Sequence, residues 1–327
     1  MEDTILRVKD LKIGIKGRKG ITYPVENVNF EIRRGETFAL VGESGSGKSM
    51  TALSIMGLLS SWSSYLDTEI SGSIVFTDKQ GISHELTELS EKEYDRLRGN
   101  DISMIFQEPL TALNPVLSVG KQIMEVLLLH NKMTHKEAKE RAIELLNQVE
   151  IPNAEERFQC FPHQFSGGQL QRIMIAMAIA CNPACLIADE PTTALDVTVQ
   201  KQILELLKKI QRENHMSIFI ITHDLAVVSE FADTVAVMYS GNIMEYGTVE
   251  QIFHNPDHPY TELLLKSIPT MDTVPGTPLL TKKDFLYSSD AGTMRKFFDP
   301  DCRGRITFRK VGENHYVSTA FIQEGAA

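Results

Sequence analysis

An excess of basic residues is the first thing that this sequence lacks. Its 327 residues include 33 Lys and Arg but 43 Asp and Glu, which gives a formal net charge of −10 at pH 7. Proteins that bind the phosphate backbone of nucleic acids normally present a strongly basic face. The acidic balance therefore argues against nucleic acid as a partner. With 42% hydrophobic residues, the chain is long enough for one large globular domain or two smaller ones.

Long apolar runs and a leader segment are also lacking. No stretch reaches the roughly 20 consecutive apolar residues that a membrane-spanning helix needs. The first ten residues, MEDTILRVKD, do not follow the basic, apolar and small-residue order of a signal peptide. We therefore expect an untargeted, cytosolic chain.

Cysteine is scarce as well, with only Cys160, Cys181, Cys185 and Cys302 present. Four cysteines are too few for a disulfide scaffold in a chain of this length, and they lack the paired spacing of a zinc site. We interpret the first three as small residues of the core rather than as metal ligands.

Hydrophobic patterning predicts an α/β protein. Short alternating stretches within residues 6–30 and 71–78 favour an antiparallel sheet. Residues 108–180 have the period of helices and interrupt an alternation of buried strands and helices. This indicates a parallel-sheet core with a helical subdomain that loops out of it. The buried strands are expected at residues 36–42, 184–190 and 217–224, the helices of the core at 48–59 and 197–214, and a closing hairpin at 234–247.

The domain boundaries follow from composition. We assign residues 1–268 to the main domain, with its helical subdomain at about residues 108–180. Residues 269–327 are rich in Pro, Gly, Thr and Asp near their start, and such a change of composition favours a separate C-terminal extension.

A phosphate-binding loop is the strongest single motif. GESGSGKS fits G-x-x-x-x-G-K-[ST] and lies between a predicted strand and a predicted helix, where a plain glycine turn is the weaker alternative. Its glycines let backbone N–H groups surround phosphates, Lys48 reaches the terminal oxygens, and the Ser49 hydroxyl can bind Mg²⁺. The expected nucleotide-binding residues are Gly42, Glu43, Ser44, Gly45, Ser46, Gly47, Lys48, Ser49 and Met50.

Polar residues that could act on a phosphate follow the neighbouring buried strands. Asp189 and Glu190 end the strand at 184–190, and carboxyl ends of parallel strands are where open sheets bind ligands. We expect Asp189 to hold Mg²⁺ through water and Glu190 to act as a general base toward the attacking water. His223 ends the next strand and can donate to a γ-phosphate oxygen. Gln107 follows another apolar strand and can contact both Mg²⁺ and the water.

A second anion-binding motif occurs about 120 residues further along the chain. HQFSGGQLQR precedes the apolar run IMIAMAIA, so a serine and two glycines stand at the start of a buried helix. The N-terminus of a helix offers unpaired N–H groups and the positive end of its dipole, which suit an anion.

The ordered series of motifs resembles the ATP-binding subunit of an ABC transporter. GESGSGKS, MIFQEP, FSGGQ, CLIADEP, TALD and ITHD correspond to its Walker A, Q-loop, signature, Walker B, D-loop and switch histidine. The resemblance implies a P-loop NTPase fold with a RecA-like core, an antiparallel β subdomain and a helical insert. It implies hydrolysis of ATP to ADP and phosphate, with Glu190, His223, Lys48 and Gln107 as catalytic residues and Ser49, Gln107 and Asp189 at Mg²⁺.

The same resemblance implies that the chain works in pairs. In ABC ATPases two domains associate head to tail, so Ser166, Gly167, Gly168 and Gln169 of this chain would act on ATP held by the partner. Asp196 would belong to the D-loop. The helical segment after Gln107 would receive a membrane subunit.

Two longer stretches, MIFQEPLTALNPVLSVGKQI and NPDHPYTELLLKSIP, resemble the D-type ATPase chain of oligopeptide and dipeptide importers. The second stretch also predicts a helix that begins near Thr261. This resemblance implies a second ATPase subunit of the F-type as the heterodimer partner, two transmembrane permease subunits and an extracellular or periplasmic peptide-binding protein. The chain would then lie at the cytoplasmic face of the membrane. Nickel or metallophore import and an identical second subunit remain open alternatives.

The sequence departs from the family pattern in places. Phe165 stands where leucine is usual, and Leu170 stands where arginine is usual. The aromatic residue that stacks on adenine is expected near residues 13–15, where there is none, so Tyr23 is the candidate.

The C-terminal extension departs from the family pattern as well. Relatives with an iron-sulfur-like segment need four thiolates, whereas here only Cys302 is present in the extension and the last position is Ser318 or Thr319. We therefore predict no iron-sulfur cluster.

Two other classes share part of this pattern. An ABC-type ATPase that acts on nucleic acid would be expected to carry a tandem second ATPase domain, a long coiled coil or a basic arm, and the sequence has none of these. A small-molecule kinase would share the phosphate loop but not SGGQ, TALD or the switch histidine.

Overall fold

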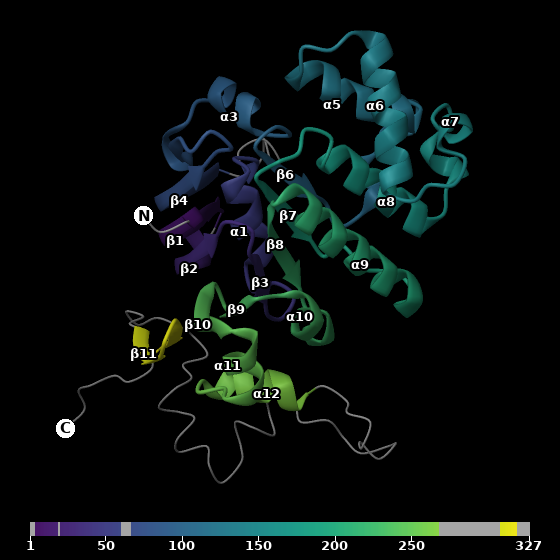
Figure 1. Cartoon of the computed structure of the whole chain (residues 1–327). Helices are drawn as coiled ribbons and strands as arrows, with labels where there is room; N and C mark the ends of the chain where they lie inside the picture. The colour runs from purple at the N-terminus through teal and green to yellow at the C-terminus, as the bar shows by residue number, and fades with distance from the viewer. Residues whose placement is uncertain (1–3, 19, 60–66, 268–307, 319–327) are drawn as a thin grey trace, which may run out of the picture.

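The computed structural model describes residues 4–18, 20–59, 67–267 and 308–318 (Figure 1). Its centre is an eight-stranded sheet in the order β11-β12-β10-β9-β3-β8-β7-β6. The five strands from β9 to β6 in this order pair in parallel, which confirms the predicted α/β fold with a parallel core. The central strands are β3 (Thr37–Val41), β6 (Ile102–Ile105), β7 (Cys185–Asp189), β8 (Ser217–Thr222) and β9 (Thr234–Tyr239).

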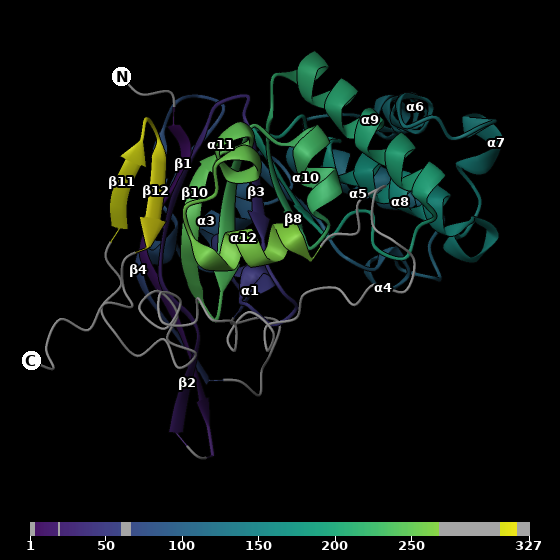
Figure 2. The same ribbon diagram turned by 90° about the horizontal axis from the view of Figure 1, so that it is seen from below.

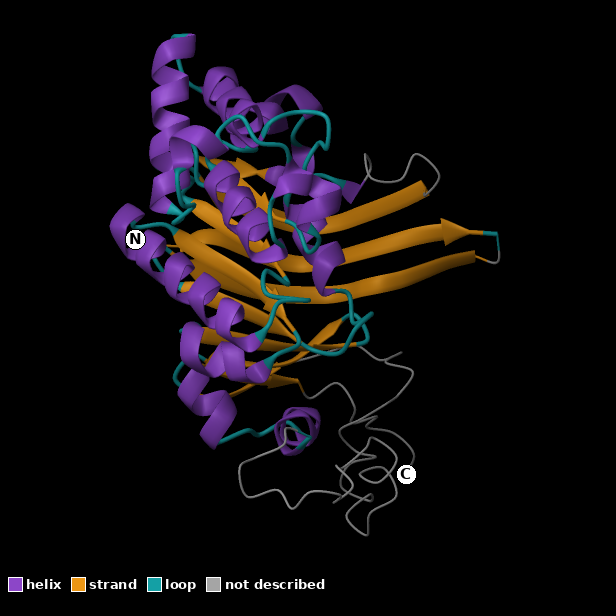
Figure 3. Cartoon of the chain, turned by 90° about the vertical axis from the view of Figure 1, so that its right-hand side faces the viewer, coloured by secondary structure: helices purple, strands orange, loops and turns teal. Residues whose placement is uncertain are grey.

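The parallel strands are buried on both faces because successive side chains point to opposite sides of the sheet. Ala39 and Val41 of β3 pack into one hydrophobic cluster, with helices that include α8 (Gly167–Ala178) and α9 (Val197–Asn214). Phe38 and Leu40 pack into the other cluster, with α1 (Lys48–Ile55) and the antiparallel sheet. Figure 3 shows the strands in orange with helices packed against them.

The antiparallel sheet has the order β2-β1-β4-β5. Its strands are β1 (Thr4–Gly17), β2 (Gly20–Arg33), β4 (Asp67–Thr77) and β5 (Ser83–Glu85). The β1–β2 hairpin is long, and Figure 2 shows β2 reaching well beyond the central sheet. Phe30 of β2 stacks on Phe38 of β3 with ring centroids 4.7 Å apart, which fixes the two sheets against each other.

The remaining strands extend one edge of the central sheet. The predicted hairpin at residues 234–247 is observed as β9 and β10 (Asn242–Thr248). Strand β12 (His315–Ser318) then pairs with β10, and β11 (Phe308–Gly312) pairs with β12. The described part of the predicted C-terminal extension therefore joins the central sheet. The proposed boundary at residue 269 lies outside the described residues and stays a prediction.

Helices occupy most of residues 109–178, as the period of the sequence predicted, and lie to the upper right of Figure 1. Thr134 and Glu137 form a capping box at the start of α6, which satisfies N–H groups that a helix start leaves unpaired. The helices of this region are α4 (Pro109–Ala112), α5 (Val119–His130), α6 (His135–Gln148), α7 (Ala154–Arg157) and α8, with a 3-10 turn at Pro162–Gln164.

The other helices lie outside this region. They are α3 (Glu91–Leu97), α10 (Leu225–Phe231), α11 (Val249–His254) and α12 (Pro259–Lys266), with a 3-10 turn at Leu86–Glu88. Helix α12 begins at Pro259 rather than near Thr261, because the His258 side chain caps it and proline is well suited to the first helical position.

The cysteine interpretation holds for the residues that the structure describes. Cys181 and Cys185 are buried, and Cys160 is half-buried. Burial raises the pKa of the Cys185 thiol to about 12, so it remains a protonated core residue. Cys302 lies outside the described residues. Within the described ranges, every helix is too short or too polar to cross a membrane.

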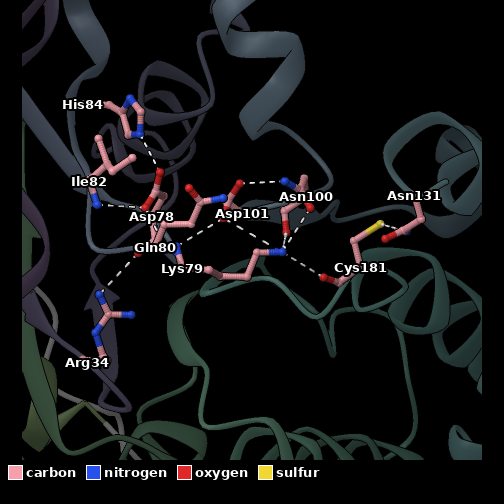
Figure 4. A network of polar contacts seen from close by, with 10 residues as sticks. All are labelled: Arg34, Asp78, Lys79, Gln80, Ile82, His84, Asn100, Asp101, Asn131 and Cys181. Carbon is pink, nitrogen blue, oxygen red and sulfur yellow. Dashed lines mark hydrogen bonds and ion pairs between the residues drawn. The ribbon is translucent and has the colours of Figure 1, made fainter.

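A polar network joins the antiparallel sheet, the central sheet and the helical region (Figure 4). The Lys79 ammonium, just after β4, donates to the carbonyl oxygens of Asn100 at 3.0 Å and Cys181 at 3.1 Å. Asp101 accepts from the Lys79 backbone N–H and from the Asn100 amide, and Asn131 donates to the Cys181 sulfur. Lys79 therefore ties together three parts of the chain that are distant in sequence.

We expect Lys79→Met to lower the free energy of unfolding by about 0.5–1.5 kcal/mol, because methionine keeps the aliphatic stem but removes the ammonium that donates to the carbonyl oxygens of Asn100 and Cys181. Chemical denaturation measures the change. The control is Lys136→Met, whose ammonium is exposed and lies 3.9 Å from Glu140. That pair should contribute less than about 0.5 kcal/mol, and equal effects of the two substitutions would contradict the structural role of Lys79.

Candidate active site

The phosphate-binding loop lies where the sequence predicted it, between β3 and α1. Three glycines in the loop have left-handed φ angles, of 153° at Gly42, 80° at Gly45 and 107° at Gly47. A Cβ atom added at Gly42 would lie 2.1 Å from the carbonyl oxygen of Met238, and one at Gly47 would lie 2.4 Å from that of Pro24. The loop is therefore held tightly between β9 and β2.

Gly42 gives a direct test of this packing. We expect Gly42→Ala to destabilise the fold by more than about 3 kcal/mol, because both the clash with a backbone carbonyl and the left-handed φ oppose the new side chain. Gly35→Ala is the matched control, since Gly35 has a φ of 75° with open space around it and should cost only about 1 kcal/mol. Denaturation curves of both variants measure the difference, and similar losses would contradict a tight contact at Gly42.

Lys48 is buried at the start of α1 and donates to two carbonyls of its own loop. Its Nζ atom lies 2.9 Å from the oxygen of Gly42 and 2.8 Å from that of Glu43. Burial lowers the pKa of Lys48, while the carboxylates of Glu190, Asp189 and Glu43 oppose this effect. The ammonium therefore lies among acidic groups at the centre of the predicted site.

Ser49 and Asp189 meet at the end of β7. The Ser49 hydroxyl donates to the Asp189 carboxylate at 3.0 Å. Burial raises the pKa of Asp189, and Glu190 raises it further, whereas the Ser49 hydrogen bond and the Lys48 charge lower it. A hydroxyl beside a carboxylate is the kind of oxygen pair that Mg²⁺ prefers, so these residues suit the cation that the sequence predicted.

Glu190 is held by three side chains, two from neighbouring strand ends and one from its own turn. Its Oε2 atom accepts hydrogen bonds from the Gln107 amide at 2.9 Å and the Thr193 hydroxyl at 2.8 Å, and its Oε1 atom lies 3.2 Å from Nδ1 of His223. The parallel order of β6, β7 and β8 explains this convergence, because their carboxyl ends meet at one edge. Sequence reasoning found Gln107 and His223 but missed Thr193, which carries no signal beyond its place three residues after Glu190.

The backbone around Glu190 is unusual. Its φ is 46°, and its N–H donates to the carbonyl of Ile221 on β8 at 2.8 Å. The chain leaves β7 in a left-handed turn that few L-residues adopt. This turn directs the Glu190 side chain toward Gln107 and His223.

The signature residues lie elsewhere in the chain. Ser166 caps α8 and is exposed; its N–H donates to the Gln169 side chain, and its hydroxyl accepts from the Gln169 N–H. Gly168 lies against α9, where an added Cβ would come within 2.7 Å of Val199. Asp196 caps α9 by accepting from the N–H of Val199 at 3.0 Å. Figures 1 and 2 both place α8, the helix that Ser166 caps, among the helices of the insert and away from α1, the helix that follows the phosphate loop.

The departures from the family pattern have structural explanations. Phe165 and Leu170 are both buried in the core on either side of the signature residues, and the Arg157 guanidinium lies 5.2 Å from the Phe165 ring. Bulky apolar side chains therefore fill these positions without altering Ser166 or its glycines.

Tyr23 lies on β2, next to Pro24 and Val25, which touch Gly47. Its hydroxyl is 3.3 Å from Glu69, and the Lys12 ammonium lies 3.8 Å above its ring. The residue as a whole is 38% exposed. Its contact with adenine stays a prediction.

The predicted absence of a cluster is also untested. Ser318 is fully buried at the end of β12, whereas Cys302 and Thr319 lie outside the described residues. Within the described ranges, His, Cys, Asp and Glu side chains form no group of three that could hold a metal ion.

The loop fits a phosphate-bearing ligand. Ser46 is buried, and its hydroxyl has no hydrogen-bond partner among the described residues. A buried polar group of this kind normally has a partner, and a bound phosphate oxygen would supply one. The buried Ser46 hydroxyl therefore suits a nucleotide phosphate, and the pair of Ser49 and Asp189 suits Mg²⁺.

Comparison with known proteins agrees with this geometry. Residues 25–193 match the family described as ABC transporter, and residues 244–303 match the oligopeptide/dipeptide transporter C-terminal region. The oligopeptide transport ATP-binding protein OppD of Bacillus subtilis is 48% identical over 333 residues, which cover 98% of this chain and 90% of that protein. The dipeptide transport ATP-binding protein DppD of the same organism is 52% identical over 270 residues, covering 83% and 78%. A dimeric ATP-binding cassette solved in a post-hydrolysis state with ADP and phosphate is 28% identical, with a TM-score of 0.63 over 75% of this chain and 99% of that one.

Proposed function

The chain belongs to the ABC transporter family, in its oligopeptide and dipeptide importer branch, and from this premise we propose that it powers peptide import by closing head to tail on a second ATPase subunit. As an ABC-type ATPase it binds ATP and converts ATP and water to ADP and phosphate.

The separation between the two anion-binding motifs is the observation that supports pairing. Ser166 stands exposed at the start of α8, in a part of the chain distant from the phosphate loop. A helix N-terminus that carries a serine and two glycines suits a phosphate. In a head-to-tail pair, Ser166–Gln169 of one chain would contact the γ-phosphate held by the loop of the other, with Asp196 in the adjoining loop, so ATP would become part of the interface.

Glu190 is the general base in this proposal. Hydrolysis of the γ-phosphoryl group proceeds by in-line attack of water, and the protein contributes position and charge. Glu190 takes the proton of that water, while Gln107 and Thr193 fix its carboxylate and His223 lies at its other oxygen. Lys48 stabilises the negative charge that develops on the phosphoryl oxygens.

Ser49, Asp189 and Gln107 are the residues that would hold Mg²⁺. When bound, the cation neutralises phosphate charge and orients the oxygens. The Ser49 hydroxyl donates to the Asp189 carboxylate at 3.0 Å, and this hydrogen bond keeps the two groups beside each other.

Loss of the γ-phosphate removes contacts that bridge two chains, so the closed pair is no longer favoured and opens. We place the receiving groove for a permease subunit in the helices that follow Gln107. The partners in this proposal are a second, F-type ATPase subunit, two transmembrane permease subunits and, indirectly, an external peptide-binding protein. The chain would be held at the cytoplasmic face of the membrane by the permeases.

Cargo is inferred from the named relatives, because the ATPase does not touch the transported molecule. Peptide is favoured by the oligopeptide and dipeptide proteins reported above. Nickel or metallophore import is the alternative within the same family.

The decisive experiment is transport by the complete importer in proteoliposomes. With its external binding protein present, a mixture of radiolabelled di- and oligopeptides should accumulate in an ATP-dependent way and should stimulate hydrolysis. Accumulation of ⁶³Ni with no effect of peptides would replace the proposed cargo but retain the ATPase role. Absence of ATP-dependent uptake of both would contradict transport coupling.

A further inference from the structure

A side-chain hydrogen bond joins α9 to the loop that carries the switch histidine. Nε2 of Gln200, in the first turn of α9, donates to Oδ2 of Asp224 at 3.0 Å, and both residues are half-buried. Asp224 directly follows His223 in the chain and directly precedes α10. The Gln200 amide therefore contacts the neighbour of the residue that lies at Glu190.

The other oxygen of the Asp224 carboxylate caps α10. Its Oδ1 atom accepts from the N–H of Ala226 at 2.9 Å and from that of Val227 at 3.4 Å. The N–H of Asp224 donates to the Thr222 hydroxyl at 3.0 Å. A capping residue has both its backbone and its side chain restrained by such bonds. Asp224 is therefore held between two helices, with Oδ1 at α10 and Oδ2 at the Gln200 amide.

Gln200 is itself placed by the start of α9. Its backbone N–H donates to the carbonyl oxygen of Asp196 at 2.8 Å. The Asp196 side chain caps the same turn by accepting from the N–H of Val199 at 3.0 Å. These bonds order the first turn, whose N–H groups would otherwise lack intrahelical partners. The Gln200 amide therefore reaches Asp224 from an ordered stretch of backbone.

His223 has few restraints of its own. Its Nδ1 atom lies 3.2 Å from Oε1 of Glu190, at the long end of the range for such a bond. The His223 side chain is 59% exposed, so packing contributes little to its placement. Its backbone runs from Thr222, the last residue of β8, to Asp224. A displacement of Asp224 would therefore reach the histidine through a single peptide unit.

We propose that Gln200 is a positioning residue for the switch histidine. Its hydrogen bond to Asp224 holds the end of the His223 loop against α9 and so keeps the imidazole at Glu190. Gln200 acts through Asp224 and lies outside the six motifs from which the site was predicted. The inference rests on the part that His223 takes beside Glu190 in the proposed function.

The first test removes the amide and nearly retains the size of the side chain. In the assembled importer, Gln200→Leu is expected to lower kcat for ATP hydrolysis by about 3- to 10-fold, which is the effect of one hydrogen bond. KM for ATP should stay within about twofold, because the phosphate loop is unaltered. A full kcat in Gln200→Leu would overturn the proposal.

Gln202→Leu is the matched control for this test. It makes the same substitution on the same helix, at an exposed residue whose side-chain oxygen lies 3.5 Å from the Arg172 guanidinium. We expect its kcat to equal that of the unaltered importer. Equal losses of kcat in Gln200→Leu and Gln202→Leu would contradict a specific role for Gln200.

The second test asks whether the effect passes through the histidine. In a His223→Ala background, Gln200→Leu should cause no further loss of kcat, because the side chain that it positions is already absent. Losses that multiply in the double variant would overturn the proposal.

The third test restores a donor to Asp224. Gln200→Lys places an ammonium that can donate to Oδ2, and we expect it to recover most of the kcat that Gln200→Leu loses. A melting temperature for each variant separates this effect from loss of fold. A kcat that follows the melting temperature, with no recovery in Gln200→Lys, would show a structural role and overturn the proposal.

Failure of this inference differs from failure of the proposed function. If His223→Ala lowers kcat while Gln200→Leu does not, the positioning role is wrong and the function stands. If His223→Ala hydrolyses ATP at the full rate, the role of His223 on which the inference rests is wrong. Failure of the unaltered importer to hydrolyse ATP would overturn the function itself.

Discussion

The Glu190→Gln variant is expected to hydrolyse ATP at least about 100-fold more slowly than the unaltered chain in the assembled importer, while ATP stays bound. Removal of a general base typically costs 10²- to 10⁴-fold in rate. The amide cannot take a proton from water, yet its size is the same and one oxygen can still accept from Gln107 or Thr193. The ground-state site therefore persists, whereas the chemical step fails.

Phosphate release measures the loss of hydrolysis, and retention of nucleotide measures whether ATP stays bound. The bound nucleotide should favour the closed pair, which size-exclusion chromatography with ATP can detect as a larger species. Glu205→Gln serves as the control, because Glu205 is an exposed residue of α9 and its substitution should leave the rate unchanged. Hydrolysis at the full rate by Glu190→Gln would refute its role as the base.

The Lys48→Ala variant is expected to fail earlier, at binding. Hydrogen bonds to a charged group contribute about 1.5–3 kcal/mol, so loss of the ammonium should weaken ATP binding by about 10- to 100-fold. The substitution also leaves the carbonyls of Gly42 and Glu43 without the donor that they share in the structure. Hydrolysis would fall as well, because the same charge stabilises the transferring phosphoryl group.

Titration calorimetry with ATP and Mg²⁺ measures this loss directly. Lys201→Ala is a suitable control, because Lys201 is exposed on α9 and should not alter the dissociation constant. Unchanged affinity in Lys48→Ala would contradict the assignment of the loop. The two variants thus separate the steps, since Glu190→Gln should retain ATP and Lys48→Ala should not.

Much of the site could be predicted from sequence because its residues follow local patterns. Asp189 ends a short buried strand and Gln107 and His223 follow others, and parallel strands bring such ends to one edge of a sheet. The phosphate-binding loop can be recognised from the spacing of its glycines, lysine and serine. The order of the parallel strands is enough to bring these residues together.

Other contacts depend on the pairing of strands that are far apart in the sequence. The hydrophobic periodicity of a short segment does not reveal which strand it will pair with. Nothing around residues 308–318 indicates that they extend the central sheet through β10, because edge pairing is set by the tertiary arrangement. Thr193 was missed for a different reason, since its role arises from the turn after β7.

That turn also shows where the fold gives up stability. A non-glycine residue with a φ of 46° carries a conformational cost of roughly 1–2 kcal/mol relative to a right-handed or extended backbone. Glycine would adopt the same angle with little strain but would supply no carboxylate. Selection for heat-resistant variants of this protein would therefore favour glycine at position 190. That same replacement would abolish ATP hydrolysis, because it removes the carboxylate.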